Sequence, residues 1–135
     1  MRFLLDTSTC IAAMRGNDNV VRRMQSVTAA QCAISTITAF ELFTGVQKCR
    51  NKAAEEAKVR LLLSPVLWIE FDLNAAEQAA LVRAELESKG QTIGPYDLLL
   101  AGQAIALGIT LATNNTKEFS RIPALRVEDW TGEIR

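Results

Sequence analysis

The stretch that decides the fold is Phe3-Leu4-Leu5-Asp6-Thr7-Ser8, in which a short apolar run ends in an acid followed by two hydroxyl residues. The apolar run predicts a buried strand over residues 2–6, and Thr7 or Ser8 can cap a helix over residues 7–14. A carboxylate that directly ends a buried strand needs a cation, a helix N-terminus or water to satisfy it. The stretch therefore predicts a strand-to-helix unit with an acid at the junction.

The rest of the chain continues this alternation of strands and helices. Strands are expected over residues 30–35, 66–71 and 109–112, with a short edge strand over 126–127; helices are expected over residues 18–25, 38–48, 51–63, 75–89 and 95–107. Asn74, with Glu77 three residues on, should cap the long helix, and Pro95 should open the next one. Because the strands are continuous apolar runs, they favour a parallel sheet covered on both faces. We expect an α/β fold, a three-layer α/β/α sandwich with a mainly parallel sheet, forming one domain over residues 1–135.

Composition excludes several classes of function. The 135 residues include no histidine, so imidazole general bases, catalytic triads and zinc–histidine sites are ruled out. No apolar stretch approaches the roughly 20 residues that span a bilayer, and the N-terminus does not resemble a signal peptide, so no membrane association and a cytoplasmic location are expected.

The net charge is zero but unevenly divided along the chain. Residues 1–52 carry seven basic against three acidic side chains, which leaves the rest of the chain net acidic. Arg22, Arg23, Lys48, Arg50 and Lys52 are therefore candidates for contact with a polyanion. Solvated helix ends would explain the same charges.

Four acids lie where the predicted elements begin or end: Asp6, Glu41, Asp97 and Glu118. The carboxyl ends of parallel strands share one edge of a sheet, so all four are expected to face one cleft. Three carboxylates about 5 Å apart repel by roughly 3 kcal/mol per pair at an effective dielectric of about 20. A hard divalent cation with oxygen ligands removes that cost. Taken singly, each acid could instead be a helix cap or a solvated surface residue.

The motifs in their order resemble those of a known family, the PIN-domain ribonucleases of the VapC toxin type. The matching segments are Phe3-Leu4-Leu5-Asp6-Thr7-Ser8, Ile34-Ser35-Thr36-Ile37-Thr38-Ala39-Phe40-Glu41-Leu42-Phe43-Thr44-Gly45, Ile93-Gly94-Pro95-Tyr96-Asp97-Leu98-Leu99-Leu100-Ala101, Thr113-Asn114-Asn115-Thr116-Lys117-Glu118-Phe119 and Leu125-Arg126-Val127-Glu128-Asp129-Trp130. The resemblance covers essentially the whole chain.

This resemblance implies a Mg²⁺-dependent endoribonuclease, with Mn²⁺ as a substitute, that is the toxin of a toxin–antitoxin pair. It implies a small antitoxin partner, a homodimer, RNA as substrate (tRNA among the candidates) and contact with DNA only indirectly through the antitoxin. Asp6, Glu41 and Asp97 would be the metal ligands. Many members have an aspartate where this chain has Asn115, and Glu118 would supply the fourth acid.

Further residues are assigned around this expected site. Thr7, Ser8, Thr113 and Asn115 are candidates to orient the acids or a water molecule, although each could simply cap a helix or satisfy a loop. Arg83 either reaches the cleft or pairs with Glu87 at i+4. The alternative to an enzyme is a catalytically weak PIN-like module that binds RNA or protein.

Overall fold

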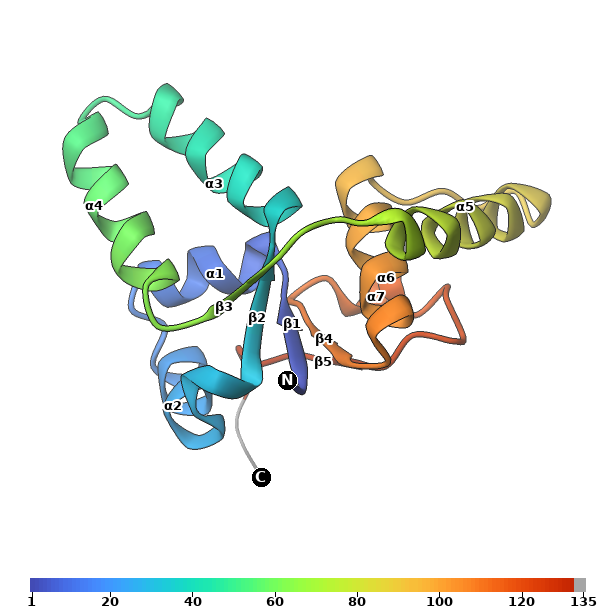
Figure 1. Cartoon of the computed structure of the whole chain (residues 1–135), viewed down its shortest axis with the longest axis horizontal. Coiled ribbons are helices and arrows are strands. Elements are labelled where there is room, and N and C mark those ends of the chain that lie inside the picture. Colours follow the sequence, from blue (N-terminus) through green and yellow to red (C-terminus); the bar gives the residue numbers. More distant parts are fainter. Residues whose placement is uncertain (133–135) are drawn as a thin grey trace.

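The computed structural model describes residues 1–132 and has alternating strands and helices (Figure 1). In chain order the elements are β1 (Phe3–Leu5), α1 (Thr7–Met14), α2 (Asp18–Val27), the 3-10 turn η1 (Ala29–Gln31), β2 (Cys32–Ser35), α3 (Thr36–Lys48), α4 (Lys52–Leu63), β3 (Leu67–Ile69), α5 (Leu73–Ser88), α6 (Pro95–Leu107), β4 (Thr110–Ala112), α7 (Thr116–Phe119) and β5 (Val127–Glu128). Within this part of the chain, no helix is long and apolar enough to cross a membrane.

The five strands form one sheet in the order β3-β2-β1-β4-β5, and every neighbouring pair is parallel. The central strand is β1, whose Leu4 lies opposite Ala33 of β2 and Leu111 of β4. Parallel pairing brings the carboxyl ends of the strands to the same edge, so the residues after Leu5, Ser35 and Ala112 are neighbours in space.

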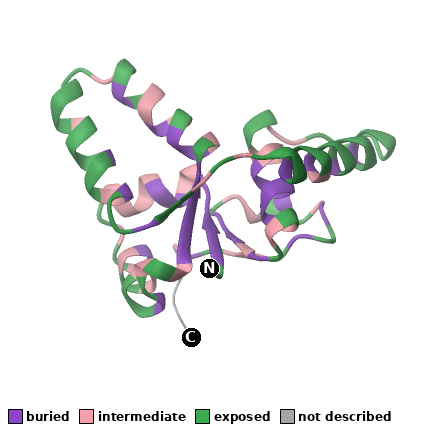
Figure 2. Ribbon diagram, viewed as in Figure 1, coloured by how far each residue is buried: buried purple, intermediate pink, exposed green. Residues whose placement is uncertain are grey.

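Two hydrophobic cores cover the two faces of the sheet. Side chains alternate along β1, so Phe3 and Leu5 pack in one core with α1 to α4, while Leu4 packs in the other with α5, α6 and α7. Figure 2 shows the central strands buried, with the exposed residues on the outer sides of the helices. The expected three-layer α/β/α sandwich is confirmed, and its sheet is parallel throughout the described residues.

Helix α3 begins two residues earlier than predicted. Its cap is Ser35, whose Oγ accepts a hydrogen bond from the backbone N–H of Ile37 at 3.1 Å. Ser35 thus ends β2 and starts α3 with no loop between them. The buried residues of this helix are Thr38, Ala39, Leu42 and Val46. Phe40 is off this face and is 53 % exposed.

The predicted cap of the long helix α5 is also wrong. The cap is Asp72, whose Oδ1 accepts from the backbone N–H of Ala75 at 2.9 Å, and the helix begins at Leu73. Asn74 therefore lies inside the first turn. Both residues are good caps, and Asp72 comes first where the chain leaves β3.

Helices α5 and α6 cross in close contact. Ala75, Ala79 and Val82 form a buried stripe on α5, and a Cβ added to Gly102 of α6 would lie 2.5 Å from the backbone of Ala79. The small residues of α5 thus serve packing within the chain.

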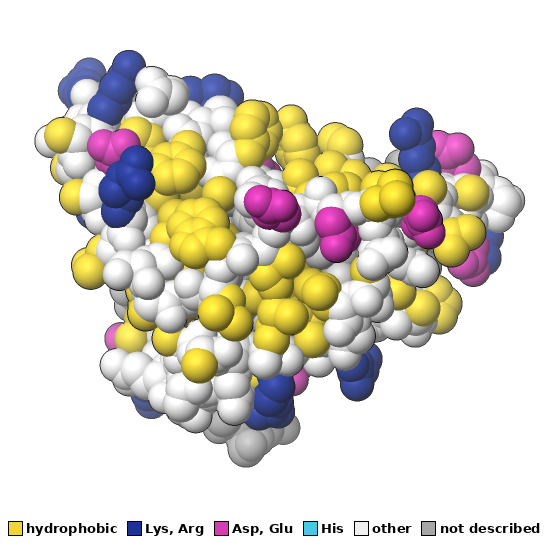
Figure 3. Space-filling model, viewed as in Figure 1, with side chains coloured by type: hydrophobic (Ala, Val, Ile, Leu, Met, Phe, Trp, Pro, Cys, Tyr) yellow, Lys and Arg dark blue, Asp and Glu magenta, His cyan; other side chains and the backbone are white. Residues whose placement is uncertain are grey.

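Strand β3 forms one edge of the sheet and is shorter than predicted, over Leu67–Ile69. Figure 3 shows hydrophobic side chains gathered across the middle of one face of the molecule. On this strand Leu67 and Trp68 are each 46 % exposed. The Trp68 indole is nevertheless anchored, because its N–H donates to the carbonyl of Leu63 at 3.2 Å.

Candidate active site

Asp6 lies at the junction of β1 and α1, at the carboxyl edge of the sheet. It is 2 % exposed and caps α1, because its Oδ1 accepts from the backbone N–H of Thr9 at 2.9 Å. The same oxygen accepts from the Ser8 hydroxyl at 2.7 Å. Asp6 is therefore a helix cap, as the alternative interpretation of the sequence proposed. Capping uses only one of its two carboxylate oxygens.

Glu41 lies in the second turn of α3 and faces the first residue of α1. The Thr7 hydroxyl donates to Glu41 Oε1 at 2.7 Å, across 34 residues of sequence. Since Thr7 follows Asp6 directly, this bond ties the acid of α3 to the end of β1. This hydrogen bond agrees with the prediction that Thr7 orients one of the acids. A role of Thr7 in catalysis stays a prediction.

Asp97 in the first turn of α6 and Glu118 in α7 share one neutral partner. The Asn115 side-chain amide donates to Asp97 Oδ2 at 3.4 Å and also to Glu118 Oε2. Asn115 is held by its own backbone N–H, which donates to the hydroxyl of the buried Thr113 at 2.9 Å. The structure therefore brings Asp97, Asn115 and Glu118 together from two separate elements.

The pKa of Asp97 responds to the charges of the other three acids, so the four carboxylates interact electrostatically. Burial raises the pKa of Asp97 from 3.8 to about 6, with the Asp6 carboxylate as the next cause. The hydrogen bond from Asn115 opposes this rise, while Glu118 and Glu41 add to it. A carboxyl group poised near neutral pH beside other acids is a common property of functional sites.

The donor set suits a hard divalent cation. Hydrogen bonds from the described residues reach only one oxygen of each of the four carboxylates, so the second oxygen of each accepts none. Carboxylate oxygens are the ligands that Mg²⁺ and Mn²⁺ prefer. Within residues 1–132, no three Asp, Glu or Cys side chains are already arranged to hold an ion. One oxygen of each of the four carboxylates instead accepts from a hydroxyl or amide donor.

Two residues around the cluster were not singled out from the sequence. The buried Thr9 hydroxyl donates to the carbonyl of Ala112 at 2.9 Å, which joins α1 to the end of β4. The backbone N–H of Asn114 donates to Ser8 Oγ at 3.1 Å, which docks the loop after β4 onto α1. Thr9 could have been noticed from the sequence as a hydroxyl residue three positions after the capping acid Asp6. Its partner could not, because Ala112 is 103 residues away.

The basic residues expected to contact RNA are spread over several elements. Arg22 on α2 and the group Lys48, Arg50 and Lys52 around the α3–α4 connection are exposed. Arg23 instead forms an ion pair with Glu128 of β5 at 2.7 Å. Of these, Lys48 shares a hollow with the acid Glu41.

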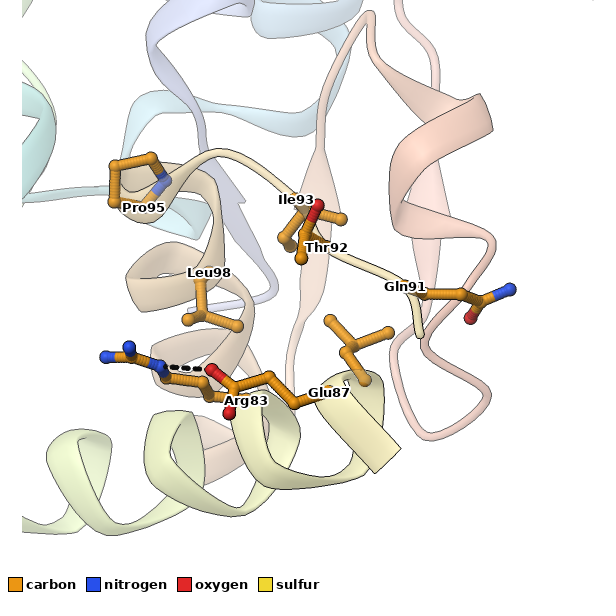
Figure 4. Close-up of a pocket in the computed structure, with 8 residues that line it drawn as sticks. Arg83, Glu87, Gln91, Thr92, Ile93, Pro95 and Leu98 are labelled. Atoms are coloured by element: carbon orange, nitrogen blue, oxygen red, sulfur yellow. Dashed lines mark hydrogen bonds and ion pairs between the residues drawn. The ribbon is translucent and has the colours of Figure 1, made fainter. Parts of the chain in front are cut away.

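Arg83 lies at a different hollow of about 220 Å³ between α5 and the start of α6. Figure 4 shows its guanidinium bonded to Glu87, at 2.9 Å, among apolar neighbours such as Leu98. None of the four acids lines this hollow. The i+4 pairing foreseen for Arg83 is therefore formed.

Fold and site together define an α/β protein with a carboxylate cluster at the strand ends of a parallel sheet. The family model for the PIN domain matches residues 3–125, and the chain belongs to the PIN-domain family, in its VapC branch. The recognition made from the motifs is confirmed.

Relatives and solved structures match over nearly the whole chain. The tRNA(fMet)-specific endonuclease VapC of Salmonella typhimurium is 37% identical over 96% of this chain and 98% of its own length. Ribonuclease VapC2 of Rickettsia felis is 39% identical, with the same two coverages. Among solved structures, DNA-bound VapBC from Salmonella typhimurium matches with a TM-score of 0.91 at 37% identity, covering 96% of this chain and 98% of that one. VapBC2 from Rickettsia felis, bound to a DNA fragment from its promoter, matches with a TM-score of 0.89 at 37% identity, covering 95% and 98%.

Proposed function

We propose that this chain is an endoribonuclease toxin that hydrolyses RNA phosphodiesters at the carboxylate cluster. The observation that carries the proposal is the arrangement of the four acids. Glu41 is bonded to Thr7, the residue after Asp6, while Asp97 and Glu118 share Asn115. Each acid keeps one carboxylate oxygen free of hydrogen bonds from the described residues. The full-length similarity to enzymes named as VapC ribonucleases supports this reading, and the Salmonella relative makes tRNA the first substrate to test.

In this proposal Asp6, Glu41 and Asp97 hold Mg²⁺ or Mn²⁺, and Glu118 is the fourth acid. The ion supplies charge neutralisation at the phosphate and a lowered pKa for the attacking water. The chain contributes the positions of the acids. Thr7 fixes one oxygen of Glu41, Ser8 fixes one oxygen of Asp6, and Asn115, itself held by Thr113, fixes Asp97 and Glu118.

A neutral Asn115 also limits the negative charge of the site. An aspartate there would add a fifth carboxylate beside Asp97, whose pKa the other acids already raise. An amide donates hydrogen bonds to both neighbours instead. We therefore propose that Asn115 orients the acids and that one ion is held most firmly.

The partners of this chain, like its activity, are inferred from related proteins. We propose a small antitoxin that inhibits the enzyme, as solved VapBC complexes of related chains support, with DNA contacted only through that antitoxin. We further propose a homodimer, a cytoplasmic location and a single PIN-like domain over residues 1–135.

The test is RNA cleavage by purified wild-type protein and by Asp97→Asn. We expect cleavage of tRNA with Mg²⁺ or Mn²⁺, its loss with a chelator, and a fall of more than about a hundredfold in kcat for Asp97→Asn, because a metal ligand is removed. Glu77→Gln, an exposed acid on α5, is the control and should cleave at the wild-type rate.

The opposite result would favour the binding-module alternative. If Asp97→Asn binds RNA and cuts it as fast as the wild type, the carboxylate cluster is not catalytic. Binding of RNA without any cleavage by the wild-type protein, with either metal, would lead to the same conclusion.

A further inference from the structure

Two hollows flank the C-terminal half of α1 and share two lining residues. One, of about 370 Å³, is lined by Ser8, Ile11, Arg15 and Asn114, among others. The second, of about 410 Å³, lies between α1, α3 and α4 and is lined by Ile11, Arg15 and the acid Glu41, among others. Arg15 therefore lines both hollows, one of which also includes Ser8 and the other Glu41.

The first hollow is joined directly to the acid cluster. Ser8 contributes to its lining, donates its hydroxyl hydrogen to Asp6 at 2.7 Å and accepts from the backbone N–H of Asn114 at 3.1 Å. Gly16, at the far end, has φ +78°, and a Cβ added there would meet nothing within 4 Å, so the turn after α1 leaves this end open. A strand of substrate lying in this hollow would contact Ser8, which is hydrogen-bonded to Asp6.

Arg15 is an exposed cation without a partner among residues 1–132, where its side chain forms no hydrogen bond and no ion pair. By contrast, Arg23 and Arg83 are paired with glutamates. A guanidinium presents several N–H groups in a fixed fork that matches two phosphate oxygens, so an unpaired one beside a polar hollow suits a phosphodiester.

We propose that Arg15 is a substrate-positioning residue that binds a backbone phosphate of the RNA strand flanking the cleaved bond, with the strand running through the hollow beside Ser8 and Asn114. The proposal rests on the proposed ribonuclease function. It identifies the ligand as the sugar–phosphate backbone, because the guanidinium fork matches phosphate oxygens and no aromatic side chain is among the described residues that line the hollow to hold a stacked base.

A simpler role for Arg15 is to stabilise its own helix. It is the C-terminal cap residue of α1, where a positive charge interacts favourably with the helix dipole. That role predicts a loss of stability when the charge is removed and no change in the salt dependence of RNA binding.

The test compares the full-length wild type, Arg15→Gln and Arg15→Lys in tRNA cleavage and, in an Asp97→Asn background, in RNA binding over a range of salt concentrations. For Arg15→Gln we expect KM and Kd to rise about tenfold, kcat to change less than about twofold, and the slope of log Kd against log salt to fall by about 0.7 to 1. Arg15→Lys should restore part of the affinity. Lys89→Gln, which removes an exposed charge paired with Glu85 at the end of α5, is the control and should change none of these values.

Three results would overturn the inference. An unchanged salt slope with a lowered melting temperature would assign Arg15 to helix stability. Unchanged RNA parameters with weaker binding of the antitoxin would assign the hollow to a protein partner. Absence of RNA cleavage by the wild type would remove the proposed function and this inference with it, whereas either of the first two results would remove only the inference.

Discussion

At the scale of single residues, the site depends on neutral donors placed between acids. Asn115 donates to both Asp97 and Glu118, and Thr7 donates to Glu41. These bonds fix the direction of one oxygen in each carboxylate without cancelling the charge. Burial raises the pKa of Asp97 to about 6, and repulsion from Asp6, Glu118 and Glu41 adds to this rise.

This raised pKa predicts a pH effect on stability in the metal-free protein. The pKa of Asp97 is about 6 in the folded chain, against 3.8 for an unperturbed aspartate, so between these pH values the folded state holds the proton more tightly. The contribution of Asp97 to stability is therefore greatest below pH 4 and is lost as the pH rises to about 6. We expect urea unfolding in chelator to show a decline over this window that is smaller in Asp97→Asn. Equal pH profiles for the two proteins would contradict the assignment.

At the scale of elements, the crossing of α5 and α6 fixes the first turn of α6 and thus Asp97. Gly102 permits this crossing, because any side chain there would meet the backbone of Ala79. Backbone atoms cannot move aside as a flexible side chain can. Close packing of α5 against α6 therefore helps to hold the helix that carries Asp97, although the packed residues are not themselves part of the site.

We expect Gly102→Ala to destabilise the protein by about 1–3 kcal/mol, the usual cost of overpacking a close contact. Gly45→Ala is the matched control: it is also a helical glycine, but a Cβ there meets nothing within 4 Å. The control should be neutral or stabilised by up to about 1 kcal/mol, because alanine has the higher helix propensity. Denaturant unfolding measures both, and equal effects at the two sites would show that the contact is not tight.

At the scale of the whole molecule, Arg23 connects distant parts of the chain. It bonds Glu128 of β5 from helix α2, and its guanidinium lies over the rings of Phe3 and Trp130 at 5.5 and 5.6 Å. The two rings meet edge to face with centroids 5.1 Å apart. The two ends of the chain are thus joined around one arginine.

We expect Arg23→Met to lower the free energy of unfolding by about 1–2 kcal/mol, from the lost cation–π contacts and a partly exposed ion pair. Cleavage of RNA should keep its wild-type KM, because this guanidinium is already engaged. Arg83→Met, at an exposed i,i+4 pair with Glu87, should cost less than about 0.5 kcal/mol. A raised KM without loss of stability would instead support the phosphate contact expected for Arg23 from the sequence.

The acids and the order of elements could be predicted because both depend on local pattern. Asp6 ends an apolar run, Pro95 opens the helix that carries Asp97, and continuous apolar strands indicate a sheet covered on both sides. The error at α5 arose because Asp72 and Asn74 are equally good caps, and only the path of the chain out of β3 selects one. Arg15 gave no signal, since an arginine at a helix end is ordinary until the hollows on both sides of it are known.

The sequence by itself determined the fold class and the family and singled out the four acids as site candidates, because apolar periodicity, capping residues and motif order are properties of neighbours along the chain. Only the tertiary structure decided which polar partners those acids have, that Arg23 is engaged while Arg15 has no partner within residues 1–132, and that Gly102 must be a glycine. The physical reason is that these contacts join residues tens of positions apart. Their geometry depends on the parallel register of the sheet and on the helix crossing, which no local pattern specifies.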